Sequence, residues 1–202
     1  MKRIVFATNN EHKACEVRGI LGDCRGISVL TLRDVGFTDD IEETGATFAE
    51  NAYIKAYAAC RFSGLPAFAD DSGLMVDALS GAPGVYTARY AGEGCSSEDN
   101  INKLLDALKG VPQPERTARF ACHICCVFPD GRRIDCEEYC EGIIIDSRCG
   151  SGGFGYDPVF YLPEHGKTFA ELDAADKNAV SHRGRAIRRF FDLLRAAYVD
   201  IM

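Results

Sequence analysis

The sequence lacks any apolar run that approaches the roughly 20 residues needed to cross a bilayer. Its first apolar stretch, residues 4–7, is too short for the core of a signal peptide, because polar residues follow at once. An excess of basic residues is also missing: the net charge is −7, which disfavours nonspecific binding to a nucleic acid backbone. We therefore expect a cytoplasmic protein that binds neither membranes nor nucleic acids. It would bind a polyanion only through a local basic pocket, with the help of a metal ion.

The spacing typical of a zinc ribbon is absent as well, although the chain has ten cysteines. Cys122, Cys125 and Cys126 lie close together in the sequence, but no second Cys-x-x-Cys pair follows them. A disulfide framework is the alternative, but 202 residues can bury most of their apolar surface without bridges. We expect reduced, mostly buried thiols that pack as small apolar residues, with a metal or redox role as the second interpretation.

The chain has no internal repeat and no low-complexity tract, and we expect a single domain over residues 1–202. Thr47 and Glu50 have the spacing of a capping box at a helix start, and residues 129–131 are typical of a hairpin turn. Strands mixed with helices predict an α/β or α+β sheet covered by helices. The predicted strands lie near residues 2–8, 29–32, 67–69, 117–128, 134–145 and 158–162, with a strand or turn at 74–79, and the helices near 13–21, 48–62, 98–108, 169–176 and 181–198.

The first candidate site is the polar turn from Thr8 to Lys13, between a predicted strand and a predicted helix. Unpaired N–H groups and the positive end of the helix dipole make such a turn suitable for phosphate, and Lys13 adds a cation. The turn is not a P-loop, because it lacks glycines. The alternative is an ordinary turn in which the Asn side chains bond to the backbone.

The second candidate site is the pair Asp70 and Asp71, followed by Ser72 and Gly73. Two adjacent carboxylates need something positive beside them, and Mg²⁺ is the cation that binds through a few carboxylates and substrate phosphates. A solvated turn is the alternative. A magnesium site needs a further carboxylate, which the acidic run ending at Glu42 and Glu43 can supply, although such runs are usually solvated loops. Two polar residues that follow at helical spacing can reach the same cleft: Asn51 and Lys55.

Two segments are suited to a nucleoside. Residues 150–158 are rich in glycine, so the backbone can approach a ligand closely, and an aromatic side chain within them can stack on a base. Lys177 and the segment 181–184 contribute His182 and Arg183, whose donors can pair with base carbonyl oxygens. The alternatives are a flexible linker for the first segment and a solvated helix start for the second.

Six segments, taken together in their order along the chain, resemble the bacterial branch of the inosine triphosphate pyrophosphatase family. The resemblance covers nearly the full length, in residues 8–13, 43–56, 69–79, 81–92, 152–160 and 177–186. It implies an α/β fold with an elongated mixed β-sheet flanked by helices, and two lobes with a central cleft. It also implies a homodimer that uses Mg²⁺ to hydrolyse ITP, dITP and XTP to the monophosphate and pyrophosphate, which cleanses the nucleotide pool.

The resemblance also implies roles for single residues. Asp71 would be the general base and a magnesium ligand, with Glu43 as the second magnesium residue and Glu42 as its alternative. A donor from His182 or Arg183 to the six-carbonyl of the purine would favour ITP over ATP. The implied substrate-binding residues are Thr8, Asn10, Lys13 and Lys55 for the triphosphate, Asn9, Glu11 and His12 in the same turn, and Ser72, Phe154, Gly155, Tyr156, Asp157, Lys177, His182 and Arg183 for the nucleoside.

Two other functions are alternatives. The first is a related nucleotide enzyme that prefers modified pyrimidines or cleaves another phosphate bond, and its reaction products would distinguish it. The second is a noncatalytic nucleotide-binding module, which the acidic residues at both candidate metal positions disfavour.

Overall fold

The computed structural model describes residues 2–21 and 26–199. These residues form two compact units. Unit 1 contains the residues up to 71, then 122–138, and those from 183 onward, while unit 2 contains residues 72–121 and 139–182. The prediction of a single domain over the whole chain stays a prediction.

One mixed sheet of seven strands runs through the described residues. Its order is β2-β1-β3-β4-β5-β6-β7. Strand β1 pairs in parallel with β2 and β3, whereas β6 pairs antiparallel with β5 and β7. The strands are β1 (Lys2–Phe6), β2 (Ile27–Thr31), β3 (Ala67–Val76), β4 (Thr117–Val127), β5 (Arg133–Ile144), β6 (Phe160–Leu162) and β7 (Lys167–Thr168).

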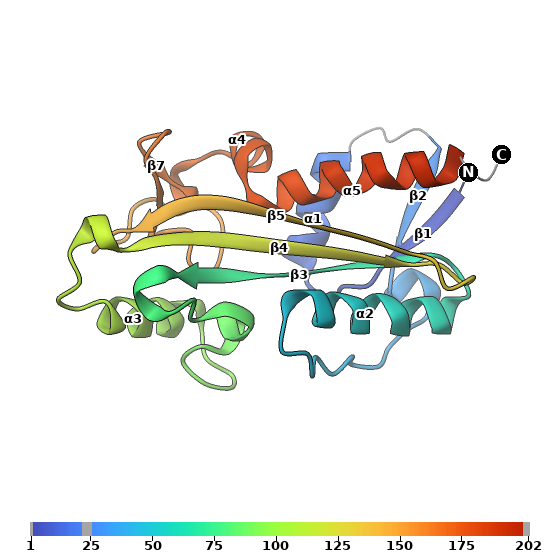
Figure 1. Cartoon of the computed structure of the whole chain (residues 1–202), viewed down its shortest axis with the longest axis horizontal. Helices are drawn as coiled ribbons and strands as arrows, with labels where there is room; N and C mark the ends of the chain where they lie inside the picture. The colour runs from blue at the N-terminus through green and yellow to red at the C-terminus, as the bar shows by residue number, and fades with distance from the viewer. Residues whose placement is uncertain (1, 22–25, 200–202) are drawn as a thin grey trace. The chain divides into compact units, whose positions relative to one another are not determined.

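The helices confirm the predicted α/β class. In unit 1, α2 and α5 lie on opposite sides of the sheet (Figure 1). Thr47 and Glu50 form the predicted capping box at the start of α2, which ends at Gly64 in a left-handed conformation. The helices are α1 (Glu11–Leu21), α2 (Phe48–Ser63), α3 (Ser97–Ala107), α4 (Ala174–Val180) and α5 (His182–Val199).

The side chains of β3 alternate between two apolar clusters, as the two-residue period of a strand requires. Phe68 packs in the cluster under α5, whereas Ala67 and Ala69 pack in the cluster under α2. Both faces of the sheet in unit 1 are therefore buried. Unit 2 has its own core, in which α3 and residues of β3 to β6 pack around Leu74, Leu104, Phe120, Phe160 and Phe169.

Two local predictions were wrong. The strand predicted at residues 67–69 continues as β3 to Val76, so residues 70–73 are part of the strand and the alternative of a solvated turn is excluded. The helix predicted at 169–176 is instead a single 3₁₀ turn, Phe169–Glu171, followed by α4.

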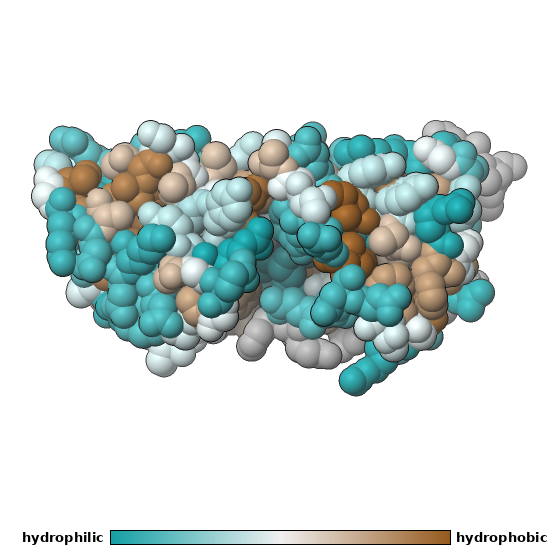
Figure 2. All heavy atoms as spheres, turned by 90° about the horizontal axis from the view of Figure 1, so that it is seen from below, coloured by the Kyte–Doolittle hydropathy of each residue, from teal (hydrophilic) through white to brown (hydrophobic). Residues whose placement is uncertain are grey.

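The surface has the mixed character usual for a protein in contact with water. Hydrophilic side chains cover much of the face in Figure 2, with hydrophobic ones in separate patches. Exposed large hydrophobic residues include Tyr57, Phe62 and Tyr86. Among the described helices, none has the length and apolar character that a membrane span needs. The nine cysteines of the described residues carry unbridged thiols and six of them are buried, as predicted.

Candidate functional site

The turn after β1 is held by its own side chains. Thr8 Oγ1 accepts a hydrogen bond from Asn10 N at 3.1 Å, and Asn10 Oδ1 accepts one from Lys13 N at 3.2 Å. Asn10 therefore caps α1, which agrees with the ordinary-turn interpretation, and phosphate binding at this turn stays a prediction. The other predicted residues of the turn are the exposed Asn9, and Glu11 and His12, whose side chains lie outside the described part of the structure.

A buried ion network joins α1, β3 and α5. Asp70 Oδ2 lies 3.0 Å from Lys13 Nζ and 3.1 Å from Arg183 Nε. The guanidinium of Arg183 also bonds through Nη1 to Glu16, three residues after Lys13 on α1. Asp70 and Arg183 are both buried, so each charge depends on its partners, because a buried unpaired charge is strongly disfavoured.

The charges of this network keep Asp70 ionised. Burial by itself raises the pKa of Asp70, but the charges of Lys13, Arg183 and Lys55 outweigh burial and hold that pKa well below its ordinary value. Asp70 Oδ1 is buried and has no hydrogen-bond partner in the described structure, so both cations bond to the other oxygen. Asp70 therefore serves as a fixed anion beside Lys13 and Arg183.

Asp71 is held by two residues of α2. Asn51 Nδ2 donates to Asp71 Oδ2 at 3.1 Å, and Lys55 Nζ lies 3.5 Å from Asp71 Oδ1. Lys55 Nζ is also 3.0 Å from Glu43 Oε1, so one ammonium group lies between two carboxylates. Asn51 and Lys55 reach Asp71 together, as their four-residue spacing predicted. Glu43, rather than Glu42, is the member of the acidic run with this contact.

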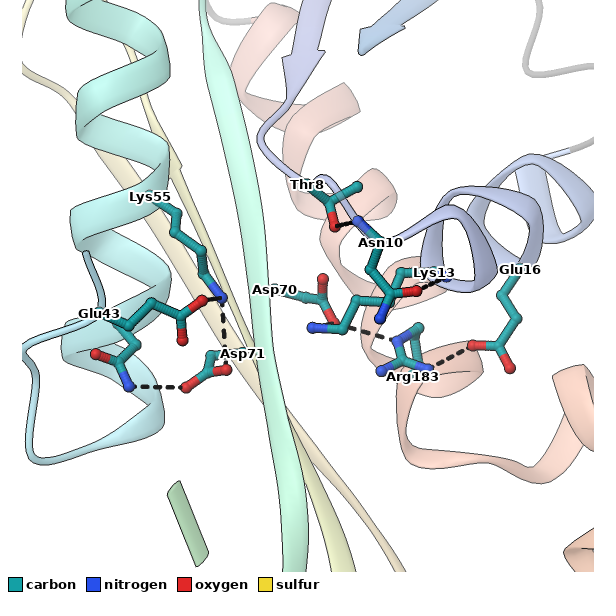
Figure 3. Close-up of polar contacts among 10 residues, drawn as sticks. Thr8, Asn10, Lys13, Glu16, Glu43, Lys55, Asp70, Asp71 and Arg183 are labelled. Carbon is teal, nitrogen blue, oxygen red and sulfur yellow. Dashed lines mark hydrogen bonds and ion pairs between the residues drawn. The ribbon is translucent and has the colours of Figure 1, made fainter. Parts of the chain in front are cut away.

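Asp70 and Asp71 point to opposite sides of β3. Figure 3 shows Asp71 on the side of Lys55 and Glu43, and Asp70 on the side of Lys13 and Arg183. Each carboxylate thus has the positive charge beside it that the pair was expected to need, but on opposite sides, because consecutive strand residues alternate in direction. Magnesium binding at Asp71 stays a prediction. The two sides still interact, since the charge of Lys13 lowers the pKa of Asp71 and the charge of Asp70 raises the pKa of Lys55.

The Asp71 carboxyl is suited to accepting a proton. Burial raises its pKa and Glu43 raises it further, while Lys55, Lys13 and Asn51 lower it, and the net pKa lies above the ordinary value. Lys55 stays protonated, because burial lowers its pKa less than Asp71, Asp70 and Glu43 raise it. A buried carboxyl with a raised pKa beside a fixed cation is typical of functional sites.

The donor set around Lys55 fits Mg²⁺. Oxygens of Glu43 and Asp71 lie 3.0 Å and 3.5 Å from the Lys55 ammonium nitrogen, so two carboxylates face the same cation. No group of three or more acidic, His or Cys side chains suited to a metal occurs among residues 2–21 and 26–199. Mg²⁺ needs no such cage, because it keeps several waters and binds through one or two carboxylates together with substrate phosphates.

In unit 2, the glycine–aromatic loop of residues 150–158 is closed by a buried carboxylate. Asp157 Oδ2 accepts hydrogen bonds from Lys177 Nζ at 2.8 Å and from Phe154 N at 2.7 Å. The Lys177 ammonium also lies 4.6 Å from the centre of the Phe154 ring. Gly153 has φ of +72°, and a Cβ there would lie 2.0 Å from Asp157 Oδ2. The loop is thus built around Asp157 and is not a flexible linker.

The remaining predicted nucleoside residues differ in exposure. Tyr156 is buried in the unit 2 core, and its hydroxyl donates to the carbonyl oxygen of Thr87 at 3.0 Å. We therefore interpret Tyr156 as a residue that positions the loop rather than as a stacking surface for a base. The ring of His182 stacks on Phe120, with centroids 4.8 Å apart. Ser72 is half-buried in β3, next to Asp71.

The Ham1 family model matches residues 4–193. This chain belongs to the Ham1 family. The dITP/XTP pyrophosphatase of Desulforamulus reducens is 51% identical to this Ham1-family chain over 198 residues, covering 98% of each chain. The dITP/XTP pyrophosphatase of Shigella flexneri is 47% identical, covering 96% of this chain and 99% of the relative.

Solved structures of Ham1 proteins have the same fold. The Coxiella burnetii HAM1 protein superposes with a TM-score of 0.89 at 42% identity, covering 97% of this chain and 100% of that one. The Staphylococcus aureus Ham1 protein gives a TM-score of 0.87 at 41% identity, with the same coverage. The family resemblance and the mixed, helix-flanked sheet that it implied are therefore confirmed.

The sequence did not point to three residues that make contacts in the candidate site. Glu16 binds Arg183, and its only signal was a carboxylate one helical turn after Lys13. Gly45 lets the backbone approach Asn51, because a Cβ at Gly45 would lie 2.6 Å from Asn51 Oδ1. Thr87 accepts the Tyr156 hydroxyl, and no feature of the sequence distinguished it from other threonines.

Proposed function

We propose that this chain hydrolyses ITP, dITP and XTP to the corresponding monophosphate and pyrophosphate, with Mg²⁺ as cofactor. The observation that carries the proposal is the buried Asp71 carboxyl, with its raised pKa, between Asn51, Lys55 and the nearby Glu43. Ham1-family relatives of about half identity and almost equal length are named dITP/XTP pyrophosphatases, which supports the same substrates here.

Each residue on the Asp71 side has a distinct task in the proposed reaction. Asn51 donates to Asp71 Oδ2 and fixes the carboxylate plane, so that Asp71 can accept a proton from the attacking water. Lys55 carries a positive charge that offsets phosphate charge, and burial strengthens its effect. Mg²⁺ held by Glu43 and Asp71 would neutralise the phosphoryl oxygens as charge develops on them.

On the other side of β3, Lys13 supplies a second cation for the triphosphate. Because Lys13 is paired with Asp70, we propose that Asp70 sets the position of its ammonium group. Arg183 already bonds to Asp70 through Nε and to Glu16 through Nη1. Because these donors are in use, we propose that the preference for a purine with a six-carbonyl depends on His182 at least as much as on Arg183. The loop of Phe154 and Asp157, with Lys177, forms the proposed nucleoside site.

The test is a product assay on a panel of triphosphates. Purified protein with Mg²⁺ is expected to release pyrophosphate from ITP, dITP and XTP much faster than from ATP, and to release no orthophosphate. Orthophosphate as the product, or equal rates on ITP and ATP, would contradict the proposal. The same assay with EDTA is expected to abolish turnover.

The chain is also proposed to act as a cytoplasmic homodimer, as the family resemblance implies. Light scattering coupled to size-exclusion chromatography tests the dimer, since one chain has a mass of 22.1 kDa. A single species of one-chain mass at micromolar concentration would contradict it.

A further inference from the structure

Residues 81–92 belong to the segments that resemble the family, but the proposed reaction leaves them without a task. They follow β3 after the short 3₁₀ turn Asp77–Leu79 and fold back against the end of the strand. Met75 and Pro83 form an isolated antiparallel bridge, and Val76 N donates to Ala82 O at 3.1 Å. Among the described residues, β1 pairs with β3 only at Ala67 and Phe68. The backbone groups of β3 that face the same way beyond Phe68 therefore need other hydrogen-bond partners.

Thr87 supplies one of these partners through its side chain. Leu74 N donates to Thr87 Oγ1 at 3.0 Å, three residues after Asp71 in the same strand. Leu74 is fully buried, so its N–H has no water as a substitute partner. A buried donor that loses its acceptor keeps the whole penalty of desolvation. The hydroxyl of Thr87 is therefore important for holding residues 84–89 against β3.

Thr87 makes a second bond through its backbone. Its carbonyl oxygen accepts the Tyr156 hydroxyl at 3.0 Å. Tyr156 lies inside the turn that Phe154 and Asp157 close, in which Phe154 N donates to Asp157 Oδ2 and Asp157 N donates to Phe154 O at 3.3 Å. One residue thus connects β3 to the glycine–aromatic loop by two hydrogen bonds, and all of these groups lie within unit 2.

We propose that Thr87 is a positioning residue for the nucleoside: it holds the Phe154–Asp157 loop at a fixed place relative to β3. This role rests on the proposed function, because it assigns nucleoside binding to that loop. Its consequence is specific, since a displaced loop weakens nucleoside binding while the groups around Asp71, which lie in unit 1, are unchanged. Loss of the link therefore raises KM and leaves kcat almost as it was.

The decisive variant is Thr87→Val, which keeps the shape of the side chain and removes the acceptor for Leu74 N. It is expected to raise KM for ITP about tenfold, the size of effect that one lost hydrogen bond produces, with kcat within about twofold of wild type. Thr87→Ser keeps the hydroxyl and is expected to restore the wild-type KM. Tyr156→Phe removes the second bond and is expected to raise KM in the same way.

The two bonds act through one residue, so their effects are expected to be coupled. The double variant T87V/Y156F should raise KM by clearly less than the product of the two single effects. Thr117→Val is a matched control in unit 2, because Thr117 Oγ1 donates to Asp77 in an exposed contact. Thr117→Val is expected to leave KM unchanged.

The outcomes separate this inference from the proposed function. If wild type releases no pyrophosphate from ITP, the proposed function fails and the role of Thr87 falls with it. If wild type is active but Thr87→Val keeps the wild-type KM, or loses thermal stability with no change in KM, then Thr87 is a structural residue only. A Thr87→Ser variant with the high KM of Thr87→Val would also overturn the inference, because the hydroxyl would not be the cause.

Discussion

The carboxylates of Asp70 and Asp71 have opposite electrostatic surroundings. Asp70 bonds to Lys13 and Arg183, which hold its pKa well below the ordinary value despite burial. Asp71 has Lys55 as its nearest cation at 3.5 Å, and burial together with Glu43 raises its pKa. At neutral pH the charge of Asp70 therefore stabilises the fold, whereas the charge of Asp71 destabilises it. The two isosteric Asn variants are expected to differ accordingly.

Asp71→Asn is expected to lower kcat by roughly 10²–10⁴, the usual contribution of a positioned base. Its Tm without Mg²⁺ and substrate should equal or exceed that of wild type. The reason is that the folded-state pKa of Asp71 lies above the ordinary 3.8, so ionising Asp71 at neutral pH favours the unfolded chain. Steady-state kinetics and calorimetry measure both effects. Near wild-type turnover would remove Asp71 from the role of base.

Asp70→Asn is expected to destabilise the protein by about 3–5 kcal/mol, the cost of breaking a buried ion pair. The folded-state pKa of Asp70 is lowered from 3.8, so its stabilising charge is present above that pH and is lost as the pH falls below it. Wild type should therefore lose stability on acidification below about pH 4 more steeply than Asp70→Asn. Urea unfolding between pH 7 and pH 3 measures this. Equal slopes would contradict the assignment.

At the scale of elements, a glycine decides the form of the loop that holds Asp157. Gly153 has a positive φ and its Cα faces the Asp157 carboxylate, so a Cβ would collide with it at 2.0 Å. The same carboxylate holds Lys177. A side chain at Gly153 therefore disturbs both the loop and Lys177. The strain of a positive φ by itself costs less than this collision.

Gly153→Ala is expected to raise KM for ITP at least tenfold and to lower Tm. Gly94→Ala is the matched control in the same unit, because Gly94 has φ of +71° and a Cβ added there would meet no atom within 4 Å. The control should lose roughly 1–2 kcal/mol of stability from backbone strain and keep its KM. Kinetics on both variants, with Tm as the second readout, separate collision from strain. Equal KM values would show that the loop tolerates the added carbon.

The start of α2 was predictable because its signal is local. Thr47 and Glu50 lie within four residues and satisfy each other's backbone groups. The hairpin of β4 and β5 was predictable for the same reason, with Gly131 at a positive φ in its turn. The continuation of β3 through Asp70 and Asp71 was not, because charged residues are rare in buried strands and only the surrounding cations make them stable there.

At the scale of the whole molecule, the net charge is −7, yet each of the two units holds cations that are largely removed from water. Lys13, Lys55, Lys177 and Arg183 are each paired with a carboxylate and largely removed from water. Strand β3 carries the last residue of unit 1, Asp71, and the first of unit 2, Ser72. The chain thus places the proposed base and the first nucleoside residue next to each other by covalent connection alone.

The Mg²⁺ concentration that the enzyme needs is expected to depend on Glu43 and Asp71, the two carboxylates that contact Lys55. Glu43→Gln should raise the Mg²⁺ concentration for half-maximal activity about tenfold, since one of two charged ligands becomes neutral. Glu42→Gln is the matched control and should behave as wild type. Titration of Mg²⁺ at saturating ITP measures this. An identical Mg²⁺ dependence in Glu43→Gln would show that Glu43 is not a metal ligand.

The sequence by itself determined the α/β class, most helix and strand positions, the family and the set of residues to consider, because these depend on local periodicity, capping and motif spacing. Only the tertiary structure decided which of these residues meet. It put Asp70 and Asp71 on opposite sides of β3, brought Glu43 to Lys55, tied Arg183 to Glu16, and brought Thr87 within hydrogen-bond distance of Tyr156. These contacts join residues far apart in the chain, and their partners are set by strand pairing and packing, which local sequence patterns do not encode.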